Sequence, residues 1–220
     1  MHISVIWSNL VRFFRFNPQK EKRMDMSIFQ IESNKATPAQ GSLLVSAPFL
    51  KDYHFERSVV LLAEHSDEGS MGIVLNKHYR FRMSLSQLLG EVNQPRLFLP
   101  VFKGGPMSRE TLFYVHRLND LKGALPLGNG LYLNGDFNQM RKYILEGNPV
   151  EGMIRFYTGY AGWGVNQLME EIEANTWMVT DTSGIDLLTE PIESMWRQSM
   201  QKMGGKYAVW AKYPKYPSLN

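Results

Sequence analysis

The amino-acid sequence predicts a single α+β domain. Short apolar runs rich in β-branched residues outnumber the segments with helical periodicity. Several of these runs are joined by turns of a few residues, which favours antiparallel hairpins over a doubly wound parallel sheet. The chain has 220 residues, of which 44% are hydrophobic, so it can bury one sizeable core. Between residues 41 and 215 we find no repeat, no low-complexity tract and no linker.

Residues 1–23 differ from the rest of the chain. Polar and basic residues, including Arg12 and Arg15, interrupt their apolar ones, so the segment cannot span a bilayer and lacks the pattern of a secretory signal. Its apolar residues would share one face of a helix, which permits a weak interfacial helix. We favour a disordered extension or a mis-called start codon, with Met24 or Met26 beginning the protein.

The remainder divides into a domain and a short tail. We expect the domain to span residues 24–215 and the tail to span residues 216–220. Within the domain, residues 24–40 are a lead-in with a short helix at residues 28–31, followed by a polar stretch.

The first compact part of the domain predicts three strands. Residues 42–46 form the first, which Pro48 ends. The β-branched residues 58–64 form the second strand. The turn at residues 66–69 joins it to residues 71–76, so we expect an antiparallel hairpin.

The middle of the chain adds one helix and three strands. Residues 84–89 predict a short helix, because a serine and a glutamine there have the spacing of a capping box. Residues 97–102 predict a strand that runs into the Lys-Gly-Gly-Pro turn at residues 103–106. Residues 111–117 and 130–134 alternate apolar and polar side chains as strands do.

Two further helices have recognisable ends. Asp136 can cap a helix that runs through residue 146 and ends at Gly147. A proline at position 191 suits the first turn of a helix over residues 191–203, which two glycines follow. Residues 207–210 are rich in aromatic and β-branched side chains, which predicts an edge strand.

The segment from residue 153 to residue 181 is the most informative part of the chain. Residues 153–157 predict a buried strand, and residues 159–164 predict a glycine-rich turn. Apolar residues then recur at helical spacing up to Ile172, and residues 176–181 predict another strand.

The glycine turn has two interpretations. Its backbone amides, at the start of a helix, could bind a phosphate or a carboxylate. Its glycine spacing departs from the dinucleotide-binding and phosphate-loop motifs. We therefore favour a structural corner over which the rings of Tyr160 and Trp163 fold, with glycines where a Cβ would clash.

Charge and cysteine content limit the function. The six basic and three acidic residues in positions 1–40 account for the whole net charge of +3, and residues 41–220 hold 18 basic and 18 acidic residues. A nucleic-acid-binding domain would carry its own basic excess. Because the chain has no cysteine, it has no disulfide, thiol nucleophile or thiolate metal site.

Two segments alternate basic and aromatic residues, namely residues 77–82 and residues 206–215. Such a pattern can stack nucleic-acid bases and neutralise phosphates. It also suits aromatic rings that pack on the protein while lysine heads stay in water. We favour packing, because no nucleic-acid recognition motif accompanies either segment.

The sequence offers few catalytic groups. Its five histidines lack the spacing of a zinc site, and no serine lies in a nucleophile motif, so we expect neither a metal nor a cofactor. His116, on a strand after the Gly-Gly-Pro turn, is the best acid/base candidate, since a cleft beside that turn would expose it. The alternative is a partly buried histidine with satisfied ring nitrogens.

Six ordered motifs resemble the YqgE/AlgH family of bacterial proteins. They are GSLLVSAPFL from Gly41, FERSVVLLAEH from Phe55, GSMGIVLNK from Gly69, KGGP from Lys103, LFYVHRL from Leu112, and GYAGWGVNQLMEEIEANTW from Gly159. A weaker match follows in MWRQSMQKMGGKYAVW, and the resemblance covers about residues 28–210. Val165 and Asn166 depart from the common GWGPGQL pattern, which weakens the case for an anion site at that helix start.

The resemblance implies a mixed, partly barrel-like sheet surrounded by helices. It also implies a cytoplasmic bacterial protein, labelled in the family as a transcriptional regulator, and it implies no known active site. Our leading hypothesis is therefore a non-enzymatic regulatory factor with a protein partner. The neutral charge of residues 41–220 does not support the alternative of direct DNA binding.

A third hypothesis is a small-ligand binder or an enzyme. Its cleft would lie between the Gly-Gly-Pro turn and the glycine-aromatic turn, where side chains and exposed amides could converge. The candidate ligand-binding residues are Gly104, Gly105, Arg109, His116, Gly159, Gly162, Trp163 and Gly164.

Overall fold

The computed structural model describes residues 30–78 and 99–215. The described strands are β1 (Leu43–Ser46), β2 (Val59–Ser66), β3 (Gly69–Val74), β4 (Val101–Lys103), β5 (Met107–His116), β6 (Leu125–Gly128), β7 (Leu131–Leu133), β8 (Ile154–Trp163) and β9 (Trp177–Thr180). The described helices are α3 (Phe137–Leu145), α4 (Gln167–Glu173), α5 (Ile192–Met203) and α6 (Gly205–Trp210).

The strands form one open sheet, with helices against it. Its order is β6-β7-β5-β8-β3-β2-β1-β9, and β4 pairs with β8 outside this path. Neighbouring strands are antiparallel except β4 and β8, which are parallel. The prediction of a single α+β domain with a mixed sheet is confirmed. The sheet does not close into a barrel, because β6 and β9 form its two edges.

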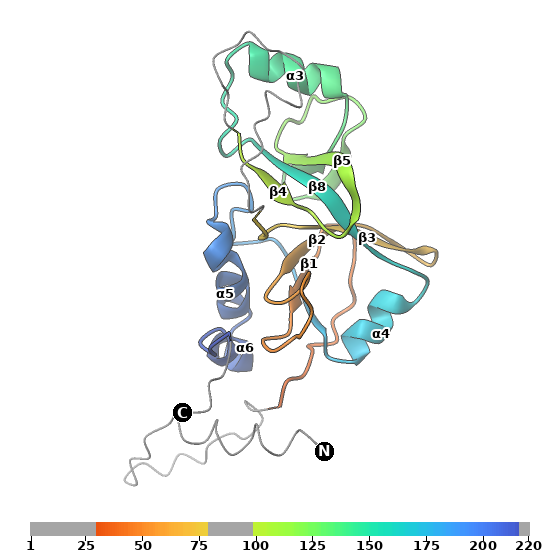
Figure 1. Cartoon of the computed structure of the whole chain (residues 1–220), viewed down its shortest axis with the longest axis vertical. Coiled ribbons are helices and arrows are strands. Elements are labelled where there is room, and N and C mark those ends of the chain that lie inside the picture. The colour runs from red at the N-terminus through yellow and green to blue at the C-terminus, as the bar shows by residue number, and fades with distance from the viewer. Residues whose placement is uncertain (1–29, 79–98, 216–220) are drawn as a thin grey trace.

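Strand β8 connects the two parts of the sheet (Figure 1). Its first residues pair with β4 and β5, and its last three pair with β3. In Figure 1, α3 lies beyond β4 and β5, whereas α5 and α6 lie on one side of β1 and β2 and α4 lies on the other. The segments that follow β3 and β4 therefore meet near the middle of the molecule.

Three hydrophobic clusters fill the spaces between the sheet and the helices. The largest includes Trp196 of α5 and Trp210 of α6. The second lies beneath α4 and includes Trp163 and Trp177. The third includes Met140 of α3 and residues of β4, β5 and β8. Burial of these apolar faces is the main force that holds the layers together.

Most predicted elements are present. The hairpin of β2 and β3 and the strands β1, β5, β7 and β9 lie where the sequence predicts them. The Asp136 carboxylate caps α3 by accepting hydrogen bonds from the amides of Asn138 and Gln139. Of the strand predicted at residues 97–102, residues 97 and 98 lie outside the described residues, and Val101 and Phe102 form β4 together with Lys103 of the predicted turn. Residues 1–29, with the proposed start and extension, lie outside the described residues, as does the predicted helix at 84–89.

The predicted turn at residues 159–164 is wrong, because β8 continues through it to Trp163. The strand bends instead of ending. Gly159 has a φ of 73°, and the pairing of β5 with β8 shifts register between Met107 and Leu112. A positive φ and a bulge redirect a strand without breaking its hydrogen-bonded ladder. β8 can therefore leave β5 and pair with β3.

Two other elements differ from the prediction. Residues 207–210 belong to helix α6, not to an edge strand. Gly204, with a φ of 69°, ends α5 and lets the chain turn so that the indole of Trp210 is fully buried. Strand β6 was not predicted, because it contains Pro126; the proline is tolerated since β6 is an edge strand.

Candidate functional site

The two glycine-rich segments lie in direct contact, as the ligand-binding hypothesis requires. The amide of Gly104 donates to the carbonyl of Thr158 (2.8 Å). A Cβ on Gly104 would lie 2.2 Å from the carbonyl oxygen of Gly159, and a Cβ on Gly159 would lie 2.7 Å from that of Gly105. The glycines thus let two backbones approach closely, and at this contact they fill the space that a ligand would need.

The other residues of the glycine-aromatic segment hold α4 against the sheet. The Glu171 carboxylate accepts hydrogen bonds from the indole nitrogens of Trp163 (3.0 Å) and Trp177 (2.7 Å), and from the side-chain amide of Gln167 (2.9 Å). The amide of Gly164 donates to the Gln167 side chain (3.0 Å). Trp163 is buried in this network, so its place is structural.

Gly162 and Gly164 are exposed on the outer side of this segment. Gly164 lines a small hollow of about 80 Å³ together with the β2–β3 turn, where Asp67 lies. This hollow is separate from the Gly-Gly-Pro turn.

His116 lies in the core. It is fully buried, its Nε2 donates to the carbonyl of Asn134 (2.6 Å), and its Nδ1 accepts from the amide of Leu118 (3.1 Å). Burial lowers the pKa of His116, which favours the neutral ring that this pattern needs. The ring also stacks on Tyr132. His116 therefore has no exposed nitrogen to offer a substrate.

A larger cavity opens on the other side of the Gly-Gly-Pro turn. It has a volume of about 610 Å³ and includes two of the predicted site residues, Gly105 and Arg109. Its other lining residues are Tyr53, His54, Glu56, Val74, Lys77, His78, Lys103 and Lys215. The volume falls in the range of small-molecule sites, about 300–1,000 Å³.

Backbone pairing brings the basic residues of the cavity together. The amide of Val74 donates to the carbonyl of Gly104 (2.7 Å), and the amide of Lys103 donates to the carbonyl of Lys77 (2.9 Å). The end of β3 therefore runs beside β4, and Lys77 and Lys103 become neighbours. Arg109 follows the Gly-Gly-Pro turn, where its Nε donates to the carbonyl of Pro106 (3.3 Å).

The remaining wall comes from the loop before β2 and from the end of the described chain. Asp52 shapes the loop by accepting hydrogen bonds from the amides of His54 and Phe55. Lys77 donates a short hydrogen bond to the carbonyl of Glu56, and the Glu56 carboxylate pairs with Lys215 (2.8 Å). Four segments distant in sequence thus build one cavity.

The cavity is predominantly cationic. Among the described residues, its lining has four basic side chains, those of Lys77, Lys103, Arg109 and Lys215, and a single carboxylate, that of Glu56. Burial lowers the pKa of Lys77 to about 8, and the charges of Lys215 and Lys103 act in the same direction. Bringing several cations together destabilises their charged forms, and an anion in their midst would relieve this repulsion.

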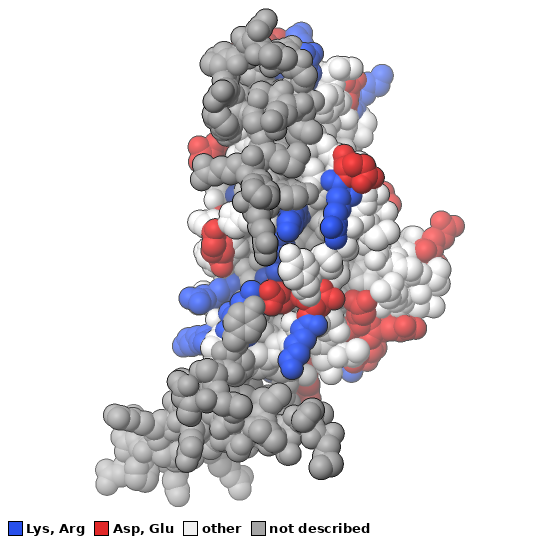
Figure 2. Space-filling view, in the orientation of Figure 1, with Lys and Arg blue, Asp and Glu red and all other residues white. Residues whose placement is uncertain are grey.

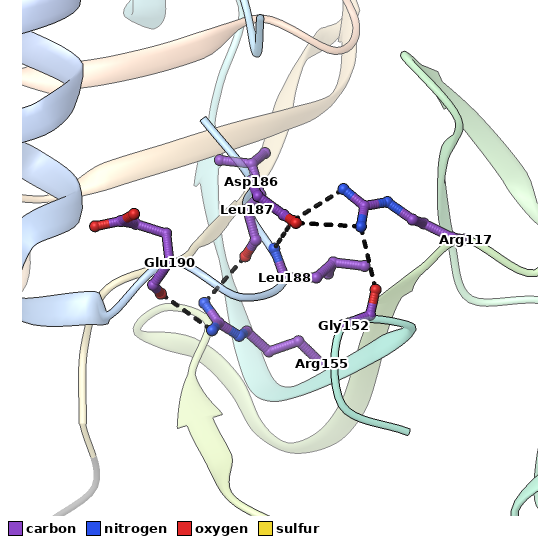
Figure 3. A network of polar contacts seen from close by, with 7 residues as sticks. All are labelled: Arg117, Gly152, Arg155, Asp186, Leu187, Leu188 and Glu190. Atoms are coloured by element: carbon purple, nitrogen blue, oxygen red, sulfur yellow. Dashed lines mark hydrogen bonds and ion pairs between the residues drawn. The ribbon is translucent and has the colours of Figure 1, made fainter. Parts of the chain in front are cut away.

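A polar network supports β4 from behind (Figure 3). Arg155 of β8 donates to the carbonyls of Leu187 (3.0 Å) and Glu190 (3.1 Å), and its guanidinium lies over the ring of Phe102. Arg117 donates to the Asp186 carboxylate (2.9 Å). These contacts fix the loop before α5 against β4. The last residue of β4, Lys103, lines the cavity.

Two other kinds of site find no support in the described part of the chain. No group of three or more histidine, aspartate or glutamate side chains there is placed to hold a metal ion. Of the helices that can be described, none has the length and apolar character to cross a membrane.

Comparison with known proteins now identifies the family. A family model described as DUF179, AlgH-like, matches residues 43–208. A UPF0301 protein of Bacteroides fragilis is 46% identical over 197 residues, which cover 90% of this chain and 99% of that protein. The chain belongs to the AlgH-like family. A UPF0301 protein of Bacteroides thetaiotaomicron is 44% identical over the same share of this chain.

Solved structures show the same AlgH-like fold. The solution structure of AlgH from Pseudomonas aeruginosa matches with a TM-score of 0.64 at 22% identity, covering 81% of this chain and 97% of that one. The crystal structure of DIP2367 from Corynebacterium diphtheriae matches with a TM-score of 0.64 at 24% identity, covering 87% and 100%. The family resemblance predicted from the motifs is confirmed. The names of the matching proteins state no activity.

Proposed function

We propose that the protein is a cytoplasmic, non-enzymatic regulatory factor that responds to a small anionic ligand. The cationic cavity beside the Gly-Gly-Pro turn carries this proposal, because four basic side chains from distant segments line one partly open cavity. The location and the regulatory role rest on the resemblance to AlgH-like proteins. The ligand hypothesis keeps two of the residues that the sequence singled out, Gly105 and Arg109.

The chemistry of the cavity suits a phosphate or carboxylate group on a small organic molecule. The Arg109 guanidinium can bind an oxyanion with two parallel hydrogen bonds, and the lysines add compact positive charges. Tyr53 is 72% exposed and lines the cavity beside His54, so its ring is available to stack on a planar part of a ligand.

Titration of the protein with inorganic phosphate and phenyl phosphate, followed by calorimetry, tests this proposal. We expect saturable binding, and at least about a tenfold loss of affinity in the double variant Lys103→Met/Arg109→Met, since each lost charge-assisted hydrogen bond costs about 1.5–3 kcal/mol. The matched control is Lys142→Met, which removes a lysine whose side chain is 76% exposed on α3. Equal affinities for the double variant and the control would refute the cavity as the site.

Direct DNA binding makes a different prediction for the same protein. On the face shown in Figure 2, basic and acidic side chains are interspersed and no continuous basic stripe appears. A duplex-binding protein would lose affinity steeply with rising salt, in proportion to the phosphates contacted. We expect no such salt-dependent affinity for duplex DNA in a mobility-shift titration. A steep slope would favour the DNA-binding alternative.

An acidic surface with exposed apolar side chains supports the proposed protein partner. Figure 2 shows acidic side chains gathered over α4 and the tip of the β2–β3 hairpin. Val165 and Met169 are exposed there by 62% and 38%, beside Glu170 and Glu173. We expect a basic protein surface to bind this face. Affinity capture compared between the wild type, Glu170→Lys/Glu173→Lys and the control Glu146→Lys tests this, because a specific partner must be lost from the first variant alone.

A further inference from the structure

Lys77 is one of two half-buried basic residues of the cavity. Lys103 is the other, whereas Arg109 and Lys215 are exposed. The Nζ of Lys77 lies against the wall of the cavity, where it donates to the neutral carbonyl of Glu56. The carboxylate of Glu56 is engaged by Lys215 (2.8 Å). Lys77 is thus held in place by a neutral acceptor, among charges of both signs: those of Lys103 and Lys215, and those of the Glu56 and Asp52 carboxylates.

We infer that the Lys77 amine is a reactive group that captures anionic aldehydes as imines. This inference rests on the proposed function, because the cations that bind an anion would hold the aldehyde beside the amine. The amide of Lys103 donates to the carbonyl of Lys77 (2.9 Å), and Lys215 pairs with Glu56, whose carbonyl accepts from the Lys77 amine. An anionic group bound between Lys103 and Lys215 would therefore hold the rest of the ligand near Lys77. Such positioning accelerates a reaction between bound groups.

The reaction balances without any further reagent. The lone pair of Nζ attacks the carbonyl carbon, and a proton passes from the nitrogen to the carbonyl oxygen, through solvent, to give a neutral carbinolamine. The carbinolamine then loses its hydroxyl group with a solvent proton as water, which leaves a protonated C=N bond between Lys77 and the ligand. Water can reverse both steps, so the capture is reversible and no group is oxidised or reduced.

The protonation state of Lys77 favours this chemistry at neutral pH. With a pKa of about 8, lowered mainly by burial, about a quarter of Lys77 is neutral at pH 7.5, against about one part in a thousand for an ordinary lysine. The charges that face it act in both directions: Glu56 and Asp52 raise the pKa, and Lys215 and Lys103 lower it. A desolvated amine close to other cations is the usual arrangement for imine formation.

Pyridoxal phosphate, which carries both an aldehyde and a phosphate, is a suitable probe. The full chain is incubated with a limiting amount at pH 7.5, reduced with borohydride to fix the imine, digested and analysed by mass spectrometry. We expect at least about ten times more label on Lys77 than on any other lysine, from its larger neutral fraction. Pyridoxal, which lacks the phosphate, should label Lys77 at least about tenfold less, because the cations cannot hold it.

Two lysine variants make the test specific. Lys77→Arg keeps the positive charge but removes the amine, so it should abolish the label and still bind phenyl phosphate in calorimetry. Lys51→Arg, at an exposed position outside the cavity, should change neither the label on Lys77 nor the binding of phenyl phosphate. Labelling spread evenly over surface lysines, or unchanged in Lys77→Arg, would overturn the inference. If Lys77 is not labelled but phenyl phosphate binds, the proposed anion site stands and the imine inference fails. If phenyl phosphate also fails to bind, both the anion site and the imine inference are refuted.

Discussion

Glu171 shows how one carboxylate can fix a helix and two strands. Its oxygens accept hydrogen bonds from the indoles of Trp163 on β8 and Trp177 on β9, while Gln167 binds it from within α4. Trp177 is 1% exposed, so its N–H has no access to water if this acceptor is lost. Leaving a buried donor unsatisfied costs the full desolvation penalty of that group. The residues that make this segment recognisable therefore serve its packing.

Removal of the Glu171 carboxylate should destabilise the protein clearly. For Glu171→Ala we expect a loss of about 2–4 kcal/mol in the free energy of unfolding, since two indole donors lose a charged acceptor. Urea unfolding followed by tryptophan fluorescence measures this loss. The neighbouring exposed residue supplies the control: Glu170→Ala should change stability by less than about 0.5 kcal/mol. Similar losses in both variants would contradict the assigned role.

Arg117 and Asp186 make a second, pH-dependent contribution (Figure 3). Burial raises the pKa of the Asp186 carboxyl, but hydrogen bonds from Arg117 and from the amide of Leu188 outweigh it, so the pKa lies below its ordinary value. A lowered carboxyl pKa stabilises the fold at pH values above the pKa of the unfolded state, about 3.9. This stabilisation is lost as the pH falls through the lower, folded-state pKa.

The variant Arg117→Met should therefore lose more free energy of unfolding, relative to the wild type, at pH 7 than at acid pH. We expect a difference of about 0.5–1 kcal/mol at pH 7, because the pair is partly exposed and solvent screens it. The difference should shrink below about pH 4 as Asp186 becomes protonated. Urea unfolding of both proteins from pH 3 to pH 7 measures it, with exposed Arg197→Met as the control. A difference independent of pH would exclude the ion pair as its source.

At the scale of elements, the close contact of β8 with the Gly-Gly-Pro turn and the start of β5 depends on glycine. Gly159 has a φ of 73°, and a Cβ there would lie 2.7 Å from the carbonyl oxygens of Gly105 and Met107. Gly123 has the same φ of 73°, but a Cβ there would meet no atom within 4 Å. The two positions thus separate the conformational role of glycine from its steric role.

Alanine at these two positions should have unequal effects. Gly123→Ala should cost about 1 kcal/mol, the penalty of a left-handed backbone for an alanine. Gly159→Ala should cost at least about 2 kcal/mol more, because the strands must separate to remove the clash and overpacking is itself costly. Thermal unfolding of both variants measures the difference. Equal losses would mean that β8 can move away from the Gly-Gly-Pro turn and the start of β5 without cost.

The sequence predicts elements well where local pattern and tertiary contacts agree. The β-branched run of β2, the turn after it and the Asp136 cap of α3 are local signals, and each is found in the structure. The predictions fail where distant contacts decide. Gly159 reads as a turn in isolation but bends a strand that has partners on both sides, and Trp210 has strand propensity but lies on a helix because its indole reaches the core.

At the scale of the whole molecule, the same reasoning explains which site residues were found. Gly105 and Arg109 line the cavity, and they belong to a turn whose glycines mark it locally. Lys77 and Lys215 lie at the ends of the two basic-aromatic segments, so a local signal existed for each. Their convergence was not predictable, because it depends on backbone pairing after β3 and on the Lys215–Glu56 contact, and both join residues far apart in sequence.

The position of strand β8 leads us to expect that the molecule unfolds as one unit. It contributes Tyr157 to the largest hydrophobic cluster, Trp163 to the second and Phe156 to the third. Because one strand belongs to all three clusters and pairs with β3, β4 and β5, loss of any cluster should weaken the others. Separate folding units would require interfaces with few contacts, and β8 supplies no such boundary.

We therefore expect a single cooperative transition in urea. Tryptophan fluorescence reports on the cluster beneath α4 through Trp163 and Trp177, and on the largest cluster through Trp196 and Trp210. Variants in which either pair is replaced by phenylalanine should each unfold with coincident fluorescence and far-ultraviolet circular dichroism curves. If the fluorescence and circular dichroism curves of one variant instead have midpoints that differ by more than about 0.5 M urea, the two halves of the sheet unfold independently. The cavity, which is built from both halves, would then be lost at the first of the two transitions.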